Sequence, residues 1–105
     1  MTVNFDIIRD KSIAAVEQDI DRVTAAKAAD ELLTLRGVRA SFVLFKHDTG
    51  VNLSARSLGE INVQLIMEKL GGGGNSTTAG GQIPDGTVDA VREQLIAAID
   101  QYLEG

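Results

Sequence analysis

Seven of the eleven glycines in this 105-residue chain lie between Gly71 and Gly86, and the first four are consecutive. Glycine has no Cβ, so a glycine run lets a ligand approach bare backbone amides. A single glycine after a helix is a common C-terminal cap, which would account for Gly71 alone. The three glycines that follow are better explained by a loop that cradles an anion or another ligand.

The run matches neither of the two familiar glycine motifs for phosphate. A Walker loop places a lysine and then Ser or Thr after its last glycine, and a dinucleotide fingerprint opens a helix after a strand. Here no lysine follows the run, and Ser76 or Thr77 stands where a third fingerprint glycine would fall. The run also follows a predicted helix, so it is a different kind of loop.

Arg56 is the best candidate for binding an anion. Alternation over residues 51–56 places Asn52, Ser54 and Arg56 on one face of a strand. A guanidinium can bind phosphate through two parallel hydrogen bonds, whereas the alternative is an ordinary surface arginine. The stretch Ser57-Leu58-Gly59-Glu60 has the form of a capping box and predicts a helix from Ser57. A helix of about 12 residues is about 18 Å long, so Arg56 and the glycine run meet only if the run folds back over the sheet edge.

Other kinds of chemistry have little support in the residues. His47 is the only histidine and is expected to be a surface residue in a turn beside Asp48. The chain has no cysteine, and no acidic cluster has a spacing suited to a metal, although a site made of carboxylates alone stays open. No Ser or Thr lies in a nucleophile-elbow pattern. The residues alone therefore indicate a binding domain, and no catalytic residue or metal ligand is assigned in this chain.

Size and charge limit the classes of partner. One domain spanning residues 1–105 is expected from the length, and the absence of cysteine suits a reducing cytoplasm. No apolar run approaches the roughly 20 residues of a membrane helix. The net charge of −5 argues against duplex nucleic acid and against direct contact with a membrane surface. A phosphate ligand would have to be held locally.

The hydrophobic pattern predicts an α/β fold, a small single domain with a mixed sheet of about five strands packed by about three helices. Strands are expected at 3–9, 12–17, 39–46, 51–56 and 80–83, and helices at 21–35, from 57 to 70 and after Thr87. The stretch Phe42–Phe45 reads as a strand buried on both faces. The last helix is expected to bury a stripe made of Val88, Val91, Leu95, Ile99 and Leu103.

The stretch from Ser54 to Gly74 resembles the C-terminal, DHH-associated substrate-binding domain of bacterial phosphoesterases. An Arg-Ser pair followed by Asn-Val and a glycine run is the broad signature of that superfamily. The segment Ser-Leu-Gly-Glu-Ile-Asn-Val-Gln at 57–64 is similar to the GdpP (YybT) type of cyclic-di-AMP phosphodiesterase. The resemblance covers the chain from about residue 20 onward.

The resemblance implies a two-part enzyme. A separate DHH domain would hold two Mn²⁺ ions and carry out the hydrolysis, while this domain grips cyclic-di-AMP or its linear product. The parent type is anchored by N-terminal membrane helices and carries PAS-like and degenerate GGDEF domains. The chain is therefore expected to be a cytoplasmic C-terminal fragment whose partners are a dinucleotide and the parent's own DHH domain.

Site residues are also implied by the resemblance, and they would hold phosphate or base. They are Arg56, Ser57, Gly72, Gly73, Gly74, Asn75 and Ala79. The family's glycine run is normally followed by histidine, whereas this chain has Asn75, whose amide donates a neutral and weaker hydrogen bond. At 78–82 the family tends to have Asn-Ala-Ala-Thr-Gln, with which Ala79 and Gln82 agree.

Two alternatives stay open. One is the accessory domain of a nano-RNA or adenosine-bisphosphate phosphatase, which would favour linear nucleotides with a free end. The other is a non-catalytic interaction module, in which the glycine run is a mobile lid or the contact of a homodimer. The segment at 57–64 favours the cyclic-di-AMP type over the first alternative.

Overall fold

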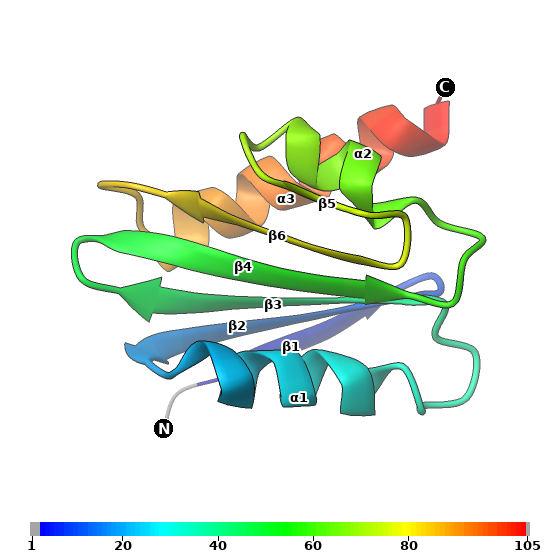
Figure 1. Ribbon diagram of the computed structural model, residues 1–105, viewed down its shortest axis with the longest axis horizontal. Coiled ribbons are helices and arrows are strands. Elements are labelled where there is room, and N and C mark those ends of the chain that lie inside the picture. Colours follow the sequence, from blue (N-terminus) through cyan, green and yellow to red (C-terminus); the bar gives the residue numbers. More distant parts are fainter. Residues whose placement is uncertain (1–2, 105) are drawn as a thin grey trace.

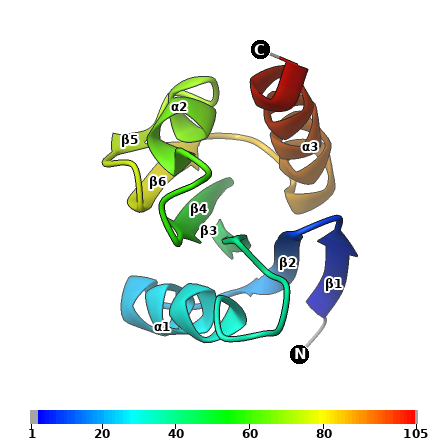
Figure 2. The ribbon, with the colours of Figure 1, turned by 90° about the vertical axis from the view of Figure 1, so that its right-hand side faces the viewer.

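The computed structural model describes residues 3–104, which form one mixed six-stranded sheet with helices on both faces (Figures 1 and 2). The elements in chain order are β1 (Val3–Ile8), β2 (Lys11–Asp19), α1 (Arg22–Leu32), β3 (Ala40–His47), β4 (Gly50–Ser57), α2 (Val63–Glu68), β5 (Gly73–Gly74), β6 (Thr78–Ile83) and α3 (Val88–Glu104). Helix α1 covers one face of the sheet, and α2 and α3 cover the other (Figure 2). The predicted α/β class with a mixed sheet is confirmed.

The strand order is β1-β2-β3-β4-β6-β5. Strands β2 and β3 are parallel because α1 connects them as a crossover, and the other neighbours are antiparallel. The sixth strand is β5, which consists of Gly73 and Gly74 alone. Two glycines carry no strand pattern, so the sequence predicts a loop there.

Strand β3 separates two apolar layers. Phe42 and Leu44 pack in the core beneath α2 and α3, while Val43 and Phe45 pack against α1. All four side chains are buried, as the unbroken apolar run predicts. On the α1 side, Ala25 and Ala29 are fully buried, and their small side chains let the helix lie close to the sheet.

Helix α2 begins later than predicted, so the capping-box interpretation of Ser57 is wrong. Strand β4 continues to Ser57, which pairs with Ala40 of β3. The N-cap is Asn62, whose side chain accepts a hydrogen bond from the Leu65 amide at 3.3 Å. Gly59 has a φ of +118°, which no helix contains, and α2 is therefore only six residues long.

Helix α3 follows the prediction except at its end. Thr87 caps it by accepting a hydrogen bond from the Ala90 amide at 3.1 Å. Four members of the expected stripe are buried, but Leu103 is 45% exposed, because the C-terminal end of this 17-residue helix lies away from the sheet (Figure 2). No helix in the described part of the chain combines the length and apolar character needed to span a bilayer.

The turn between β1 and β2 holds a buried charge. Lys11 is 2% exposed and its ammonium pairs with the carboxylate of Asp10. The backbone carbonyl of Asp10 accepts from the Arg39 amide at 2.7 Å, which ties this turn to the start of β3. The hydrogen bond from Lys11 lowers the pKa of Asp10 below its usual value of 3.8.

We expect Asp10→Asn to lower the free energy of unfolding by about 1–2 kcal/mol near neutral pH, because Lys11 stays buried without its carboxylate. A lowered folded pKa stabilises the chain above the unfolded pKa of 3.8, and that contribution is lost as the pH falls through the folded pKa. The difference in free energy of unfolding between the unaltered chain and Asp10→Asn, measured by urea unfolding, should therefore be smaller at about pH 3 than near neutral pH. Asp100→Asn, at an exposed position on α3, is the control. A gap that stays constant with pH would contradict this account of Asp10.

Candidate functional site

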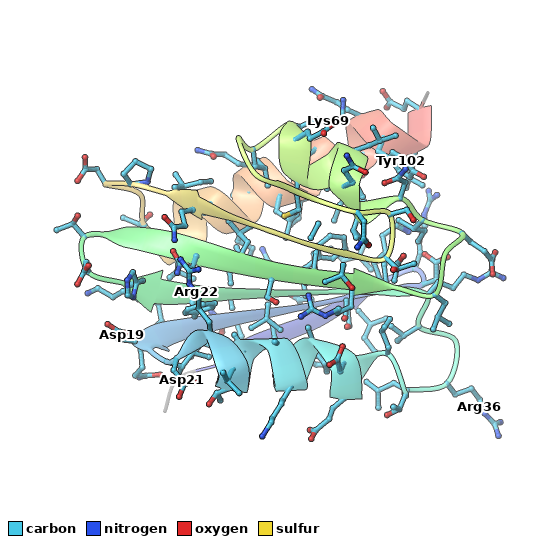
Figure 3. All side chains as sticks on the ribbon, viewed as in Figure 1. Asp19, Asp21, Arg22, Arg36, Lys69 and Tyr102 are labelled. Carbon is cyan, nitrogen blue, oxygen red and sulfur yellow. The ribbon has the colours of Figure 1, made fainter. Side chains whose placement is uncertain are left out.

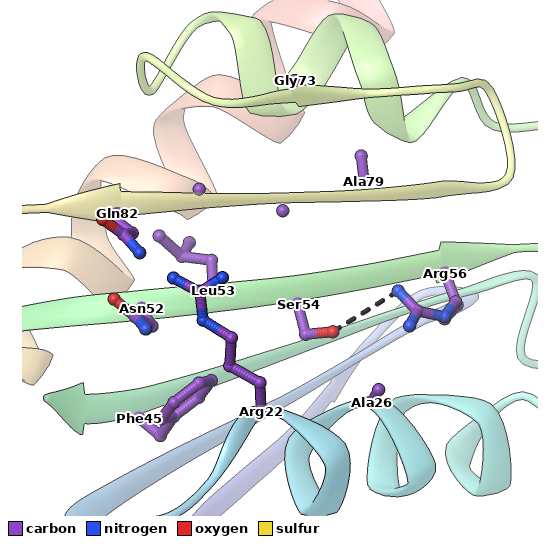
Figure 4. A pocket seen from close by; sticks show the side chains of 12 residues that line it. Arg22, Ala26, Phe45, Asn52, Leu53, Ser54, Arg56, Gly73, Ala79 and Gln82 are labelled. Atoms are coloured by element: carbon purple, nitrogen blue, oxygen red, sulfur yellow. Dashed lines mark hydrogen bonds between the residues drawn. The ribbon is translucent and has the colours of Figure 1, made fainter.

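A polar pocket opens between α1 and the β4–β6–β5 side of the sheet (Figure 4). Its volume is about 460 Å³, within the range of small-molecule sites in proteins. It is lined by Arg22, Ala26, Phe45, Asn52, Leu53, Ser54, Arg56, Gly73, Ala79, Gly80, Gly81 and Gln82. Because the lining comes from one helix and four strands, the packing of the sheet fixes its shape.

Sheet register determines which side chains share the pocket. Asn52 pairs with Gln82, and Ser54 pairs with Gly80, which in turn pairs with Gly73 at the sheet edge. Since alternate residues of a strand share a face, the polar face of β4 predicted from the sequence is the pocket floor. The two residues that follow Ser54 across the sheet, Gly80 and Gly73, are both glycines. No side chain from them therefore fills the space beside Ser54.

Arg56 is held in place by its neighbours. Its Nε donates to Asp30 of α1 at 3.1 Å, and its Nη1 donates to the Ala55 carbonyl at 2.8 Å and to the Ser54 hydroxyl at 3.4 Å (Figure 4). The side chain is 16% exposed. Its second terminal nitrogen has no partner among the described residues. The guanidinium is therefore oriented by the fold and keeps one nitrogen free to donate.

The charge of the pocket opposes that of the chain. Two arginines, Arg22 and Arg56, line the pocket, and no aspartate or glutamate does. The whole chain has fifteen acidic residues and a net charge of −5. Arg22 is exposed and has no ion-pair partner among the described residues. The carboxylate of Asp30 offsets the charge of Arg56 at 3.1 Å, so the unpaired positive charge of the lining is that of Arg22, which suits an anionic group.

The first glycines of the run end α2. Gly71 has a φ of +84° and its amide donates to the Glu68 carbonyl at 3.2 Å, while the Gly72 amide donates to the Met67 carbonyl at 2.8 Å. These two bonds form a Schellman cap. Gly71 therefore ends the helix, as expected for a single glycine that acts as a C-terminal cap. The amide of Gly72 already has a partner within the fold.

After the cap, the glycine run folds back over the sheet edge and follows β6. This is the arrangement that Arg56 and the glycine run need in order to share a site. A Cβ on Gly72 would lie 2.2 Å from the Gly80 carbonyl oxygen, and one on Gly74 would lie 2.4 Å from the Thr78 carbonyl oxygen. Side chains there cannot be accommodated, so these glycines are required by the contact of β5 with β6.

Gly73 differs from its neighbours. A Cβ built on it meets no atom within 4 Å, and the residue lines the pocket that also holds Arg56. Packing within the fold therefore does not require a glycine at this position. The missing side chain instead keeps the pocket open at the sheet edge.

Asn75 and Ser57 shape the turn between β5 and β6. The Asn75 Oδ1 accepts from the amides of Thr77 and Thr78 at 3.0 and 2.9 Å, an arrangement typical of an Asx turn. The Ser57 hydroxyl donates to the Ser76 carbonyl at 3.1 Å and accepts from the Gly59 amide at 3.2 Å. Both side chains thus hold the loop, and the Asn75 Nδ2 stays available as a donor.

The structure brings together three of the seven sequence-predicted site residues in the pocket lining, namely Arg56, Gly73 and Ala79. The other four lie around the adjoining cap and turn. The site reasoning missed Arg22, Asn52, Ser54 and Gln82. Alternation along β4 had already placed Asn52 and Ser54 on the face of Arg56, whereas nothing in the sequence distinguishes Arg22 from other helix-surface arginines.

No group of three or more His, Cys, Asp or Glu side chains comes together for a metal within residues 3–104. His47 is 46% exposed at the end of β3, with Asp19 at 3.6 Å and Asp48 at 3.7 Å. This is the surface position that the sequence predicts for the histidine.

Comparison with known proteins finds relatives that include cyclic-di-AMP phosphodiesterases. The chain is 50% identical over 90 residues to the "Cyclic-di-AMP phosphodiesterase PdeA" of Listeria monocytogenes and 56% identical over 86 residues to the "Cyclic-di-AMP phosphodiesterase GdpP" of Geobacillus thermodenitrificans. These matches cover 85% and 81% of this chain but only 14% and 13% of the relatives. The chain thus spans about a seventh of their length.

More distant similarities extend the family. The chain is 35% identical over 69 residues to the "Bifunctional oligoribonuclease and PAP phosphatase NrnA" of Thermus thermophilus, covering 66% of this chain and 21% of that protein. The crystal structure of an exopolyphosphatase-related protein from Bacteroides fragilis superposes with a TM-score of 0.80 at 20% identity, over 94% of this chain and 32% of the other. That likeness concerns the fold alone.

The DHHA1 domain family matches residues 10–105, which is nearly the whole chain. Together with the identities to the cyclic-di-AMP phosphodiesterases, this match agrees with the resemblance seen in the residues between Ser54 and Gly74. The chain belongs to the DHHA1 domain family.

Proposed function

We propose that this domain grips the dinucleotide substrate of a cyclic-di-AMP phosphodiesterase and presents it to a catalytic domain elsewhere in the parent protein. The observation that carries the proposal is a pocket with two arginines and no carboxylate on a chain of net charge −5. The names of the relatives that are 50% and 56% identical supply the substrate class.

Phosphate is gripped by Arg56 and the sheet edge. The free terminal nitrogen of Arg56 donates a charge-assisted hydrogen bond to a phosphate oxygen. The Asn75 amide donates to the Thr78 carbonyl at 2.8 Å, so alternation along the strand directs the preceding amide, that of Gly74, toward the open edge. Gly73 lets the ligand reach this edge. The Asn75 Nδ2 adds a neutral donor at the rim.

Hydrolysis is assigned to the parent's DHH domain with its two Mn²⁺ ions. The described residues include no group suited to hold them, so this domain's task is binding and orientation. In this proposal the parent is anchored in the bacterial membrane and the domain works on the cytoplasmic side, with the DHH domain as its partner.

A second candidate is the accessory domain of a nano-RNA or adenosine-bisphosphate phosphatase. The 35% identity to a bifunctional oligoribonuclease and phosphatase favours it. The two candidates differ in ligand, because the second requires a free phosphate end. The higher identities to cyclic-di-AMP phosphodiesterases rank the first candidate above it.

We expect Arg56→Ala to weaken binding of cyclic-di-AMP and linear diadenylate by about 10- to 100-fold in isothermal titration, the range for a lost charged hydrogen bond. Arg36→Ala is the matched control, because Arg36 projects into solvent away from the pocket (Figure 3). Equal binding by both variants would contradict the grip by Arg56. Preference for linear over cyclic diadenylate would favour the second candidate, and absence of binding by the unaltered chain would count against both.

Paired glycine variants test the location of the ligand. Gly73→Ala should fold normally, because its methyl group meets no atom within 4 Å, and should weaken diadenylate binding by filling the pocket edge. Gly72→Ala should lower the melting temperature, because its Cβ would lie 2.2 Å from a carbonyl oxygen. Thermal melts and titrations of both variants measure these effects. Unchanged affinity in Gly73→Ala would exclude this pocket as the binding site.

A further inference from the structure

Asn52 is a buried polar side chain without a partner. It is 5% exposed, it lines the pocket, and its side chain makes no hydrogen bond to any other described residue. Figure 4 shows it pointing into the pocket from β4, at the end away from Arg56. In the described part of the chain, the enclosed side-chain atoms that lack a partner are Ser12 Oγ and Arg92 Nε, so the Asn52 amide faces the open pocket, where it is available to a ligand group.

A second amide lies beside it. Gln82 pairs with Asn52 across β4 and β6, and directly opposed residues have Cβ atoms about 4.5–5.5 Å apart. Gln82 also lines the pocket and has no side-chain partner among the described residues. The two amides therefore form one recognition surface with two donors and two acceptors side by side.

The chemistry of this pair favours a base over a phosphate. A phosphate offers only acceptors, so it would leave the carbonyl oxygens of both amides unmatched. The adenine edge offers a donor at N6 beside an acceptor at N7, which is the pattern that Asn and Gln side chains bind, whereas guanine offers two acceptors on that edge. The pair therefore matches adenine.

The position of the pair agrees with a nucleotide. Asn52 and Arg56 are four residues apart on β4, a separation of about 13 Å, comparable with the reach of a nucleotide from phosphate to base edge. Arg22 extends from the start of α1 toward the end of the pocket where Asn52 and Gln82 lie (Figure 4). A planar guanidinium can stack on the face of a base.

We propose that this end of the pocket is an adenine subsite, in which Asn52 and Gln82 bind the base edge and Arg22 covers its face. This inference rests on the proposed function. The subsite makes the domain selective for adenine, whereas Arg56 and the glycine edge bind phosphate without regard to the base.

The test is isothermal titration with cyclic-di-AMP and cyclic-di-GMP. Asn52→Leu has nearly the same size and removes both hydrogen-bonding groups, and Asn4→Leu on the exposed face of β1 is its matched control. Asn52→Leu should lower affinity for cyclic-di-AMP about tenfold or more and leave the weaker binding of cyclic-di-GMP nearly unchanged. Arg56→Ala should weaken both ligands equally.

Melting temperatures of the variants distinguish a loss of ligand binding from a loss of folding. Asn52→Leu removes an amide that makes no hydrogen bond to another described residue, so its melting temperature should stay close to that of the unaltered chain. Gln82→Leu, at an exposed position that cannot disturb the core, should reproduce the change in selectivity even if Asn52→Leu fails to fold.

The outcomes distinguish the two proposals. Unchanged selectivity in both amide variants, with Arg56→Ala still weakening both ligands, would overturn the adenine subsite and leave the proposed function standing. An equal loss for both ligands in the amide variants would also overturn it. An unaltered chain that binds neither cyclic dinucleotide would overturn the proposed function and the subsite together.

Discussion

The close contact between the glycine run and β6 is the constraint on which the candidate site depends. Gly72 and Gly74 approach carbonyl oxygens of β6 so closely that a Cβ on either would overlap them. This contact returns the chain after α2 to the sheet edge and forms β5. It brings Gly73 into the pocket that Arg56 lines. Without it, the glycines would remain a loop at the far end of α2, away from the arginine.

Around that edge, the fold places two arginines on an acidic domain. Helix α1 supplies Arg22 to the pocket and Asp30 to the guanidinium of Arg56, so one helix both lines the site and orients its main cation. The polar residues of β4 form the floor because alternation directs their apolar neighbours to the other face, where α2 and α3 cover them. The same six-stranded sheet therefore carries the larger apolar cluster on one face, and the smaller cluster under α1 together with the pocket on the other.

The alternation of residues along strands and the helical spacing of apolar residues predicted most of this structure. Alternation gave the polar face of β4, and the apolar run gave the buried strand β3. The capping box at Ser57 failed because pairing with Ala40 and the positive φ of Gly59 keep that segment extended. Leu103 has the right helical spacing but is exposed, because the C-terminal end of α3 lies away from the sheet. Gln82 agrees with the family pattern, but its position opposite Asn52 follows only from the pairing of β4 with β6. Arg22 could not be recognised, since only the tertiary packing of α1 brings it to the pocket.

An amide-resolved nuclear magnetic resonance titration of the chain with linear diadenylate tests the central claim most directly. The account predicts that shift changes concentrate on β4, β6, the edge at Gly73 and Gly74, and the start of α1. It predicts no change in the separate groove between α2 and α3, lined by Leu65, Lys69 and Tyr102. Changes confined to that second groove, or none at saturating ligand, would contradict the claim that this pocket is the nucleotide site.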